Sequence, residues 1–403
     1  MHRIKGKEEL ETILRKRLSF DPKIEKKVRE IIAAVKKDGD SALFGITEKY
    51  DGIRLKKLKV EEKEIKNASL SLNKSLKNAI SIAKKRIEEF HRKELPNNFV
   101  FKKENSYVKK TFVPLETVGI YIPAGSAPLL STVLMTVIPA KIAGVKRIIL
   151  TSPPRGNGKI DPCILATASL CGVKEIYKIG GAQAIAALAL GTKTIPKVDK
   201  IIGPGNQYVT TAKRLLFGYV DVDLLAGPSE VLILADKSAR QLFVETDLLA
   251  QSEHNGGLAI LVTNSITLLK RVEKKVKSGY AILLKNKKEM IELANRIAPE
   301  HLQIMMEEPE KIAQKIKNSG AIFLGNYSPV AIGDYLAGPS HTLPTGGSAR
   351  FFSGLSTLSF LRAFSVICWK KGEIKKLGKV IEKLAKMEGL PEHAKSVKVR
   401  GEK

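Results

Sequence analysis

The sequence predicts an α/β fold in which parallel sheets are covered by helices, with a helical segment before them and a helical extension after them. Between residues 111 and 325, short β-branched runs alternate with Ala- and Leu-rich stretches of helical character, and several glycine-rich turns join the two. Repeated strand–turn–helix units favour parallel strands, because a parallel connection returns through a crossover helix. Ligands of such sheets bind at the carboxyl ends of the strands, so we expect the functional loops to follow the strands.

Residues 1–110 are predicted to be mainly helical and polar. Asp38-Gly39-Asp40 predicts a turn between two helices. Apolar residues recur at helical spacing at Leu76, Ala79, Ile80, Ala83, Ile87 and Phe90. We expect this segment to pack on the rest of the chain, and it contains no motif that indicates chemistry.

The middle of the chain supplies the alternating elements in order. The predicted strands are residues 118–122, 147–151, 176–179, 201–202, 231–235 and 259–262. The predicted helices are residues 130–143, 162–170, 182–190 and 240–252, with two more that start near Gln207 and Ile266. After a Gly- and Pro-rich stretch (325–356), a Lys- and Glu-rich helix should end near Glu388-Gly389, since glycine can end a helix. We therefore divide the chain into residues 1–110, 111–235, 236–365 and 366–403.

Composition narrows the class of protein. The chain has 403 residues, 43% of them hydrophobic, which suits a protein with a real core. It has no run of about 18 apolar residues, so no membrane helix is predicted. The N-terminus lacks the apolar stretch of a secretory signal, and the cytoplasm is the expected location. Cys163, Cys171 and Cys368 form no CxxC pair and are expected to be packed thiols.

The net charge of +28 raises nucleic acid as a partner. The basic residues are spread along most of the chain and are mostly interleaved with Glu, as in residues 371–386. No basic arm, zinc finger or aromatic-rich RNA motif accompanies them. We therefore predict a Lys-rich solvated surface and no nucleic-acid partner.

Two glycine turns are candidates for binding a nicotinamide dinucleotide. Gly203-Pro204-Gly205-Asn206 starts like the Rossmann fingerprint but lacks its third glycine, and Gly180-Gly181-Ala182-Gln183 also leads into a predicted helix. Glycine lets the backbone approach a phosphate and opens a helix N-terminus toward it. Each turn alone is equally consistent with a tight strand-to-helix connection.

Polar side chains with catalytic or metal-binding potential are few. Gln251 and His254 share one helix face and could converge on one ion, although the pair is also consistent with a polar helix end. Glu300 and His301 could supply two proton-transfer groups to one cavity, although exposed Glu-His pairs are common.

The Gly-rich stretch and the tail contain four more candidates. Asp334 and His341 could serve a metal ion or a substrate, but a loop Asp is usually a turn former. Glu388 and His393 stand near the C-terminus, where an isolated His is most often a surface residue.

These motifs together resemble one family. In chain order they are residues 119–125 (GIYIPAG), 139–144 (PAKIAG), 180–184 (GGAQA), 203–206 (GPGN), 226–230 (AGPSE), 250–254 (AQSEH), 298–301 (APEH) and 341–347 (HTLPTGG). In that order, and over nearly the full chain, the sequence resembles the histidinol dehydrogenases. Any one motif is modest, but the whole set in register is highly specific.

The resemblance implies a fold of two incomplete Rossmann-like domains, with NAD bound by residues 111–235 and with zinc and the catalytic groups in residues 236–365. Tyr121, Gln183 and Asn206 resemble the family's NAD contacts. One Zn²⁺ per subunit would be bound by four positions, which are Gln251, His254, Asp334 and His393. Nitrogen and oxygen ligands suit a zinc ion that exchanges ligands with substrate.

The resemblance also implies a reaction, the four-electron oxidation of L-histidinol to L-histidine through bound histidinal, with two NAD⁺ reduced. This is the last step of histidine biosynthesis. His301 resembles the base that takes the alcohol proton, and Glu300 resembles the group that activates water on the aldehyde. Ser229, His341 and Glu388 resemble substrate contacts. The zinc ligands and His301 would also lie against the substrate.

The family is a homodimer in which the C-terminal tail, here residues 366–403, reaches into the partner's site. Glu388 and His393 would then complete the neighbouring chain's site. Two departures stand out in this sequence. Ala124 replaces a usual glycine in Pro123-Ala124-Gly125, and Asn255-Gly256 follows His254 where Gly or Asp is usual. Neither change removes a proposed ligand.

Three other functions remain open at this stage. A family relative could oxidise another small polar alcohol, which a substrate panel would reveal. A nucleic-acid-binding protein would leave the Gln-x-x-His and Glu-His motifs unexplained. A metal-binding scaffold without catalysis would show no activity to lose on substitution of Glu300 or His301.

Overall fold

The computed structural model describes the chain except residues 5, 18–19, 125–126, 255 and 403. It forms two compact units, residues 1–94 with 115–360 and residues 95–114 with 361–403, and each is described by itself. These units do not follow the four predicted segments, whose standing as separate domains stays a prediction. None of the described helices combines the length and the apolar character that a membrane span needs.

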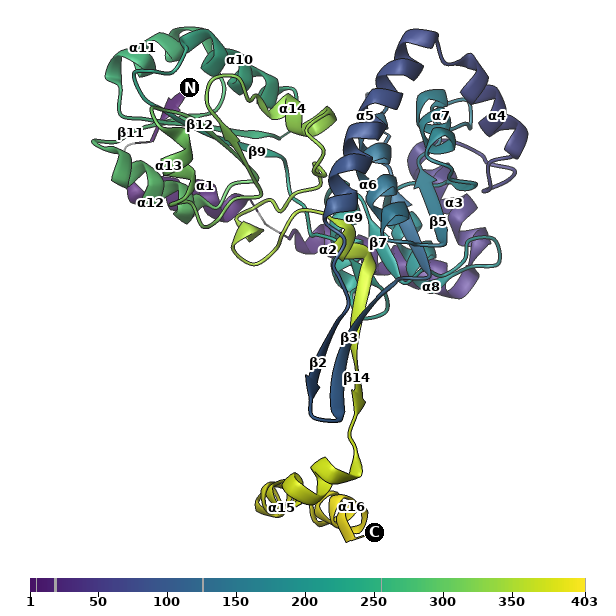
Figure 1. The fold of residues 1–403 in the computed structure, drawn as a ribbon. Coiled ribbons are helices and arrows are strands. Elements are labelled where there is room, and N and C mark those ends of the chain that lie inside the picture. Colours follow the sequence, from purple (N-terminus) through teal and green to yellow (C-terminus); the bar gives the residue numbers. More distant parts are fainter. Residues whose placement is uncertain (5, 18–19, 125–126, 255, 403) are drawn as a thin grey trace. The chain divides into compact units, whose positions relative to one another are not determined.

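The first unit contains a five-stranded parallel sheet in the order β6-β5-β4-β7-β8 (Figure 1). Its strands are β4 (Thr117–Tyr121), β5 (Arg147–Ser152), β6 (Glu175–Lys178), β7 (Lys200–Ile202) and β8 (Asp221–Val222). In chain order this is the arrangement 3-2-1-4-5, a Rossmann sheet without its sixth strand. The switch point of such a sheet lies between its first and fourth strands, here β4 and β7.

A second parallel sheet in the same unit has the order β1-β11-β10-β9-β12-β13. Its strands are β1 (His2–Arg3), β9 (Glu230–Ala235), β10 (Leu258–Thr263), β11 (Tyr280–Leu283), β12 (His301–Met305) and β13 (Ala321–Leu324). Without the short edge strand β1, the arrangement is again 3-2-1-4-5. The predicted fold class, two incomplete Rossmann-like sheets with covering helices, is therefore confirmed.

The helices follow the strands and cover both sheets. Those before residue 200 are α1 (Lys7–Lys16), α2 (Pro22–Asp38), α3 (Asp40–Asp51), α4 (Glu62–Ser71), α5 (Lys74–Lys93), α6 (Leu130–Ile142), α7 (Pro162–Leu170) and α8 (Gly181–Leu190). The later ones are α9 (Gln207–Leu216), α10 (Gln241–Ser252), α11 (Ile266–Lys275), α12 (Lys287–Ile297), α13 (Pro309–Ala313), α14 (Val330–Tyr335), α15 (Lys371–Met387) and α16 (Pro391–Glu402). One 3₁₀ turn, Ser348–Arg350, lies in the Gly-rich stretch, and a second, Thr357–Phe360, directly follows it.

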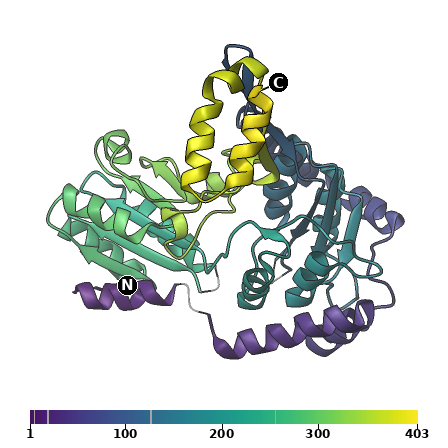
Figure 2. The ribbon, with the colours of Figure 1, turned by 90° about the horizontal axis from the view of Figure 1, so that it is seen from below.

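Alternation along the strands builds the cores. In β9, Leu232 and Leu234 pack with α1 and α12, whereas Val231 and Ile233 pack with α10 and α11 on the other face. All six residues of β9 are buried, as expected for a central parallel strand. Helix α1 belongs to the core of this second sheet, while α2 packs with α8 and α9 beside the first sheet (Figure 2).

The second unit is a three-stranded antiparallel sheet with a helix pair. Strand β14 (Leu361–Cys368) pairs with β3 (Ser106–Pro114), which forms a hairpin with β2 (Phe99–Lys103). Helices α15 and α16 pack against each other (Figure 2). Helix α15 stops at Glu388 and Gly389, and Gly389 has a φ of 72°, so the predicted helix end is confirmed. The hairpin was not predicted, because the sequence up to residue 110 was expected to be mainly helical.

One buried ion pair holds the turn after β7. The Lys213 ammonium lies 2.6 Å from Asp223 Oδ1, and these side chains are 3% and 2% exposed. Lys213 also donates to the Gly203 carbonyl, while Asp223 Oδ2 accepts from the Gly203 N–H at 2.8 Å. Gly203 has a φ of 120°, and a Cβ there would lie 2.0 Å from the Tyr121 carbonyl oxygen. The turn therefore requires glycine at position 203, and hydrogen bonds with the Lys213 and Asp223 side chains hold its backbone in place.

We predict that Lys213→Met lowers the free energy of unfolding by about 3–5 kcal/mol, because it leaves the Asp223 carboxylate buried without its partner. Asp223→Asn added to Lys213→Met should recover part of this loss, since the amide oxygen still accepts from Gly203. Chemical denaturation measures both. Lys200→Met is the control, since its partner Asp221 is 52% exposed, and it should cost under about 1 kcal/mol. Equal losses in Lys213→Met and Lys200→Met would contradict the prediction.

Candidate active site

Most of the predicted catalytic and metal-binding residues of the first unit gather at one edge of the second sheet. Ser229 directly precedes β9, Gln251 and His254 precede β10, and Glu300 and His301 stand at the start of β12. These strands are neighbours in the order β10-β9-β12 and run parallel, so their amino ends meet at the same edge. The candidate residues of this sheet therefore do not follow the strands, as was expected of them, but lie on the segments that lead into them.

Glu300 is a buried carboxyl group with few polar neighbours. Its Oε2 accepts a hydrogen bond from the Glu230 N–H at 2.8 Å. Burial raises the pKa of Glu300 to about 8, and the hydrogen bonds from the Glu230 backbone and the Ser229 side chain offset this only in part. Glu300 is therefore able to hold or release a proton near neutral pH.

His301 is held in one tautomer. Its Nδ1 lies 2.9 Å from the carbonyl oxygen of Glu230, which can only accept, so Nδ1 carries the proton. Nε2 then keeps its lone pair. The ring is 4% exposed, and burial lowers its pKa, so the neutral form that can accept a proton is favoured. The Glu300 Oε2 is 3.4 Å from the same Nδ1, so the two proton-transfer groups are direct neighbours.

Glu230 is the site residue that the sequence analysis missed. Its backbone contacts both Glu300 and His301, and its buried side chain binds Arg17 at 3.1 Å and the Gly346 N–H at 2.9 Å. One signal was present in the sequence. A charged residue opens the strand Glu230–Ala235, whose other members are all apolar.

The metal-ligand candidates of the first unit are Gln251, His254 and Asp334. Gln251 is 4% exposed, yet its Nε2 has no hydrogen-bond partner, as expected of an amide that awaits an exogenous group. His254 is exposed beyond the end of α10, and Asp334 lies near the end of α14. His341 Nδ1 lies 4.0 Å from Asp334 Oδ1, so these two side chains are neighbours, and the charge of His254 also acts on the pKa of His341.

These donors fit zinc in kind, since all offer nitrogen or oxygen, but they are incomplete. No group of three or more His, Cys, Asp or Glu able to hold a metal occurs among the described residues. The remaining candidate, His393, lies in α16, and Glu388 lies at the end of α15. Both belong to the second unit, so their place in the site stays a prediction.

His341 connects the site to α6. Its Nδ1 lies 3.2 Å from the Asp334 carbonyl oxygen and its Nε2 lies 3.4 Å from Thr132 Oγ1. Burial lowers the pKa of the ring. Thr132 was not predicted, and nothing in the sequence distinguishes it from the other buried residues of α6.

The candidate cofactor residues lie at the carboxyl edge of the first sheet, as predicted from the fold class. Tyr121 ends β4, and its hydroxyl accepts from the Gly181 N–H at 3.3 Å. Burial raises the pKa of Tyr121 to about 12. A Cβ on Gly181 would lie 2.6 Å from Gln183 Oε1, so the Gly turn brings Tyr121 and Gln183 together. Asn206 instead caps α9 by accepting from the backbone N–H groups of Tyr208 and Val209.

A pocket of about 380 Å³ adjoins the Asn206 turn. Asn206 and Thr210 line it from α9, Gly227 and Pro228 line it from the segment that leads to Ser229, and Arg17 also contributes. The pocket therefore runs from the predicted cofactor turn toward the start of β9. Tyr121 and Gln183 do not line it.

The two departures from the family's usual motifs, at Ala124 and at Asn255-Gly256, differ in what the structure shows of them. Ala124 forms a β-bridge with Pro128 and is not among the non-glycine residues with positive φ, so the alanine needs no left-handed backbone. Gly125 and Asn255, which belong to the same two departures, lie outside the described residues.

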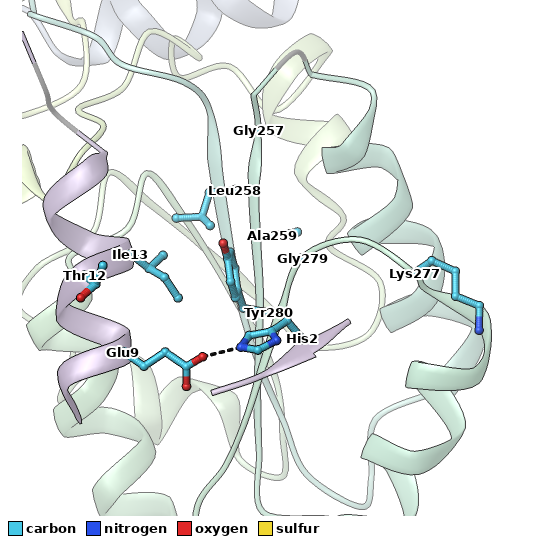
Figure 3. A pocket seen from close by; sticks show the side chains of 10 residues that line it. All are labelled: His2, Glu9, Thr12, Ile13, Gly257, Leu258, Ala259, Lys277, Gly279 and Tyr280. Atoms are coloured by element: carbon cyan, nitrogen blue, oxygen red, sulfur yellow. Dashed lines mark hydrogen bonds and ion pairs between the residues drawn. The ribbon is translucent and has the colours of Figure 1, made fainter. Parts of the chain in front are cut away.

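A second, more open pocket of about 700 Å³ lies at the amino ends of β10 and β11 (Figure 3). It contains none of the predicted site residues. Its imidazole, His2, is hydrogen-bonded to Glu9 and stacks edge-on with Tyr280. We assign it no part in the chemistry.

The family model for histidinol dehydrogenase matches residues 14–401. The chain is 45% identical over 399 residues to the histidinol dehydrogenase of Listeria monocytogenes, covering 94% of this chain and 93% of the relative. It is 43% identical over 397 residues to that of Bacillus thuringiensis, covering 94% and 92%. The crystal structure of histidinol dehydrogenase from Elizabethkingia anophelis superposes with a TM-score of 0.94 at 39% identity, covering 99% of this chain and 98% of that one.

The raised pKa of Glu300 predicts a pH-dependent stability difference. The folded protein holds this proton more tightly than the unfolded chain, so its contribution is present below about pH 4.5 and is lost as pH rises through about 8. In metal-chelated protein, Glu300→Gln should therefore gain stability over the parent between pH 5 and 9, by roughly 2–5 kcal/mol. Urea unfolding at several pH values measures the difference. Exposed Glu292 in α12 serves as control, and Glu292→Gln should show a constant difference. A constant difference for Glu300→Gln would contradict the prediction.

Proposed function

Because the chain belongs to the histidinol dehydrogenase family, we propose that it is a zinc-dependent enzyme that oxidises L-histidinol to L-histidine with two NAD⁺. The family makes it an NAD-dependent oxidoreductase that serves the histidine biosynthesis step, which is the last step of that route. We place the reaction in the cytoplasm.

The observation that carries this proposal is the buried Glu300–His301 pair. The alcohol must lose its hydroxyl proton as its hydride leaves, and the aldehyde must gain a water oxygen before the second hydride leaves. His301, neutral with Nε2 unprotonated, is suited to take the hydroxyl proton. Glu300 in its ionised form is suited to take a proton from water, and its pKa of about 8 keeps that form accessible near neutral pH.

Two groups absent from the chain itself complete the chemistry. When bound, NAD⁺ accepts one hydride in each of the two oxidations. Zinc, held by Gln251, His254, Asp334 and His393, would fix the imidazole and amine of the substrate and so supply orientation. Gln251 would bind the ion through its amide oxygen, because an amide NH₂ group donates hydrogen bonds and offers no lone pair.

Substrate contacts are assigned to residues around the same space. Ser229 is hydrogen-bonded to Glu300 and His341 faces Asp334, so both neighbour the reacting groups. Glu388 would bind the substrate amine from the tail. Tyr121, Gln183 and Asn206 would contact NAD, with the helix N-termini of α8 and α9 beside them offering N–H groups to its phosphates.

A homodimer with shared sites is part of the proposal. Helix α15 carries Leu377, Val380, Leu384 and Met387 at helical spacing, and all four are exposed, Met387 by 81%. An apolar stripe of this kind is typical of a surface that another chain covers. A second copy bound there would let Glu388 and His393 complete the partner's site.

The experiment that tests the function is NAD⁺ reduction with L-histidinol before and after zinc chelation. We expect two NADH per histidine formed, loss of activity on chelation and recovery with added zinc. Glu300→Gln should slow oxidation of the aldehyde more than oxidation of the alcohol, by about 10²–10⁴-fold. A zinc-loaded protein that gives no NADH with histidinol but does with another polar alcohol would overturn the substrate.

The shared site predicts complementation between inactive variants. His393→Ala and His301→Ala should each be inactive alone, since one removes a ligand from the partner's site and the other removes the base. Mixed after dissociation and reassociation, they should recover up to about a quarter of parental activity, because half of the dimers are mixed and each has one intact site. No recovery in verified mixed dimers would contradict a shared site.

A further inference from the structure

Beyond the proposed function, and resting on it, we propose that Arg17 is a positioning residue that sets the geometry of Glu300 and His301 through Glu230. Arg17 ends α1, far from the catalytic pair in sequence, and touches neither Glu300 nor His301 in any described hydrogen bond. The inference follows a chain of contacts from its guanidinium to the two reacting groups.

The first link is the backbone of Glu230. Its N–H donates to Glu300 Oε2 at 2.8 Å, and its carbonyl accepts from His301 Nδ1 at 2.9 Å. The orientation of this one residue's backbone therefore determines both where the carboxylate lies and which imidazole nitrogen is free. A rotation of either peptide group at Glu230 would disturb one reacting group or both.

The second link is the side chain of Glu230. Its Oε2 lies 3.1 Å from Arg17 Nη1, and its Oε1 accepts from the Gly346 N–H at 2.9 Å. The Arg17 and Glu230 side chains are 7% and 3% exposed, so water does not replace either contact. With both carboxylate oxygens bound, the side chain resists rotation of the backbone to which it is attached.

The third link joins Arg17 to the segment that precedes Glu300 in the chain. Arg17 Nη2 donates to the Ile297 carbonyl at 2.9 Å, at the last residue of α12. The chain then passes through Ala298, whose φ of 49° is left-handed, and Pro299 to Glu300. One guanidinium thus ties the start of β9 to the segment that delivers Glu300 and His301.

Arg17 is also closely packed against two glycine-containing segments. A Cβ on Gly227 would lie 2.8 Å from the Arg17 carbonyl oxygen, and one on Gly347 would lie 3.1 Å from Arg17 Nη2. The glycines allow the Ser229 and Thr345–Gly347 segments to approach this closely. The arginine is therefore held by packing as well as by hydrogen bonds.

Stability alone does not account for this arrangement. A buried ion pair contributes little net stability compared with well-packed apolar residues of the same volume, because desolvation offsets the attraction. Burial raises the pKa of Glu230 despite Arg17, so without the guanidinium the carboxyl group would tend to bind a proton and change its partners. What the pair supplies is a fixed direction for the Glu230 backbone.

The test uses the zinc-loaded, full-length enzyme and compares Arg17→Met, Arg17→Lys and Glu230→Gln with the parent. Arg17→Met should lower kcat at least about 10-fold with KM for histidinol changed less than about 3-fold, because misplaced reacting groups slow turnover more than they weaken binding. Arg17→Lys should restore part of kcat, since it keeps a charge for Glu230. Zinc content should be unchanged. A kcat for Arg17→Met within about 2-fold of the parent overturns the proposal.

The control is Arg147→Met, which removes an Arg–Glu pair of the first sheet, joined to Glu175 by two hydrogen bonds. It should leave kcat within about 2-fold. If Arg17→Met does not fold, Glu230→Gln decides, since it keeps the shape and the acceptor for Gly346. A folded Glu230→Gln with parental kcat then overturns the proposal.

A readout independent of turnover separates this proposal from the proposed function. In ¹⁵N-histidine-labelled protein, with the His301 signal assigned from His301→Gln, the parent should show the Nδ1–H tautomer and Arg17→Met a mixture. An unchanged His301 tautomer in Arg17→Met overturns the positioning role even where kcat falls. Absence of histidinol oxidation by the parent would instead overturn the proposed function, and the tautomer comparison would still judge Arg17.

Discussion

The backbone of Glu230 is the constraint on which the candidate active site depends. Burying a carboxyl group and an imidazole side by side is costly unless each finds a hydrogen bond, and one residue's N–H and carbonyl serve them both. Because β9 is central in its sheet and hydrogen-bonded to β10 and β12 on its two sides, this backbone has little freedom. The two candidate proton-transfer groups are therefore held by the backbone of a strand that is paired on both sides.

The candidate residues lie at opposite edges of the two sheets. In the first sheet, Tyr121 ends its strand and the Gly203 turn follows its own, as the general rule for parallel sheets expects. In the second sheet, Ser229, His254 and Glu300 precede theirs. Register makes this possible, since His301 pairs with Val231 and Leu258 pairs with Glu230, so the three strands begin at nearly the same level.

The sequence was sufficient to predict the strands and helices whose own residues show a clear pattern. The strands at 118–122, 147–151 and 231–235 were predicted to within about a residue or two, because β-branched runs between glycine turns and helices have few other interpretations. The hairpin at 99–114 was missed because β2 is fully exposed and β3 has only one buried residue, so neither strand shows a buried apolar pattern. The strand that pairs with β3 on its other side, β14, lies about 250 residues further along the chain. Arg17 and Glu230 were missed for a related reason: side-chain types are visible in a sequence, whereas the backbone atoms that a side chain orients are not.

Two buried ion pairs in the described part of the first unit, Lys213–Asp223 and Arg17–Glu230, have features in common. Each pair has side chains at most 7% exposed, and each binds backbone groups of a glycine-containing turn, Gly203 in one and Gly346 in the other. Glycine is needed at Gly203 because a side chain would collide with the neighbouring strand, but glycine also makes a turn easy to deform. An ion pair hydrogen-bonded to the backbone of the turn restricts this freedom without adding a side chain to the turn itself. The net charge of the chain is therefore less informative than the position of these few buried charges, which restrain the turns beside the candidate cofactor and substrate residues.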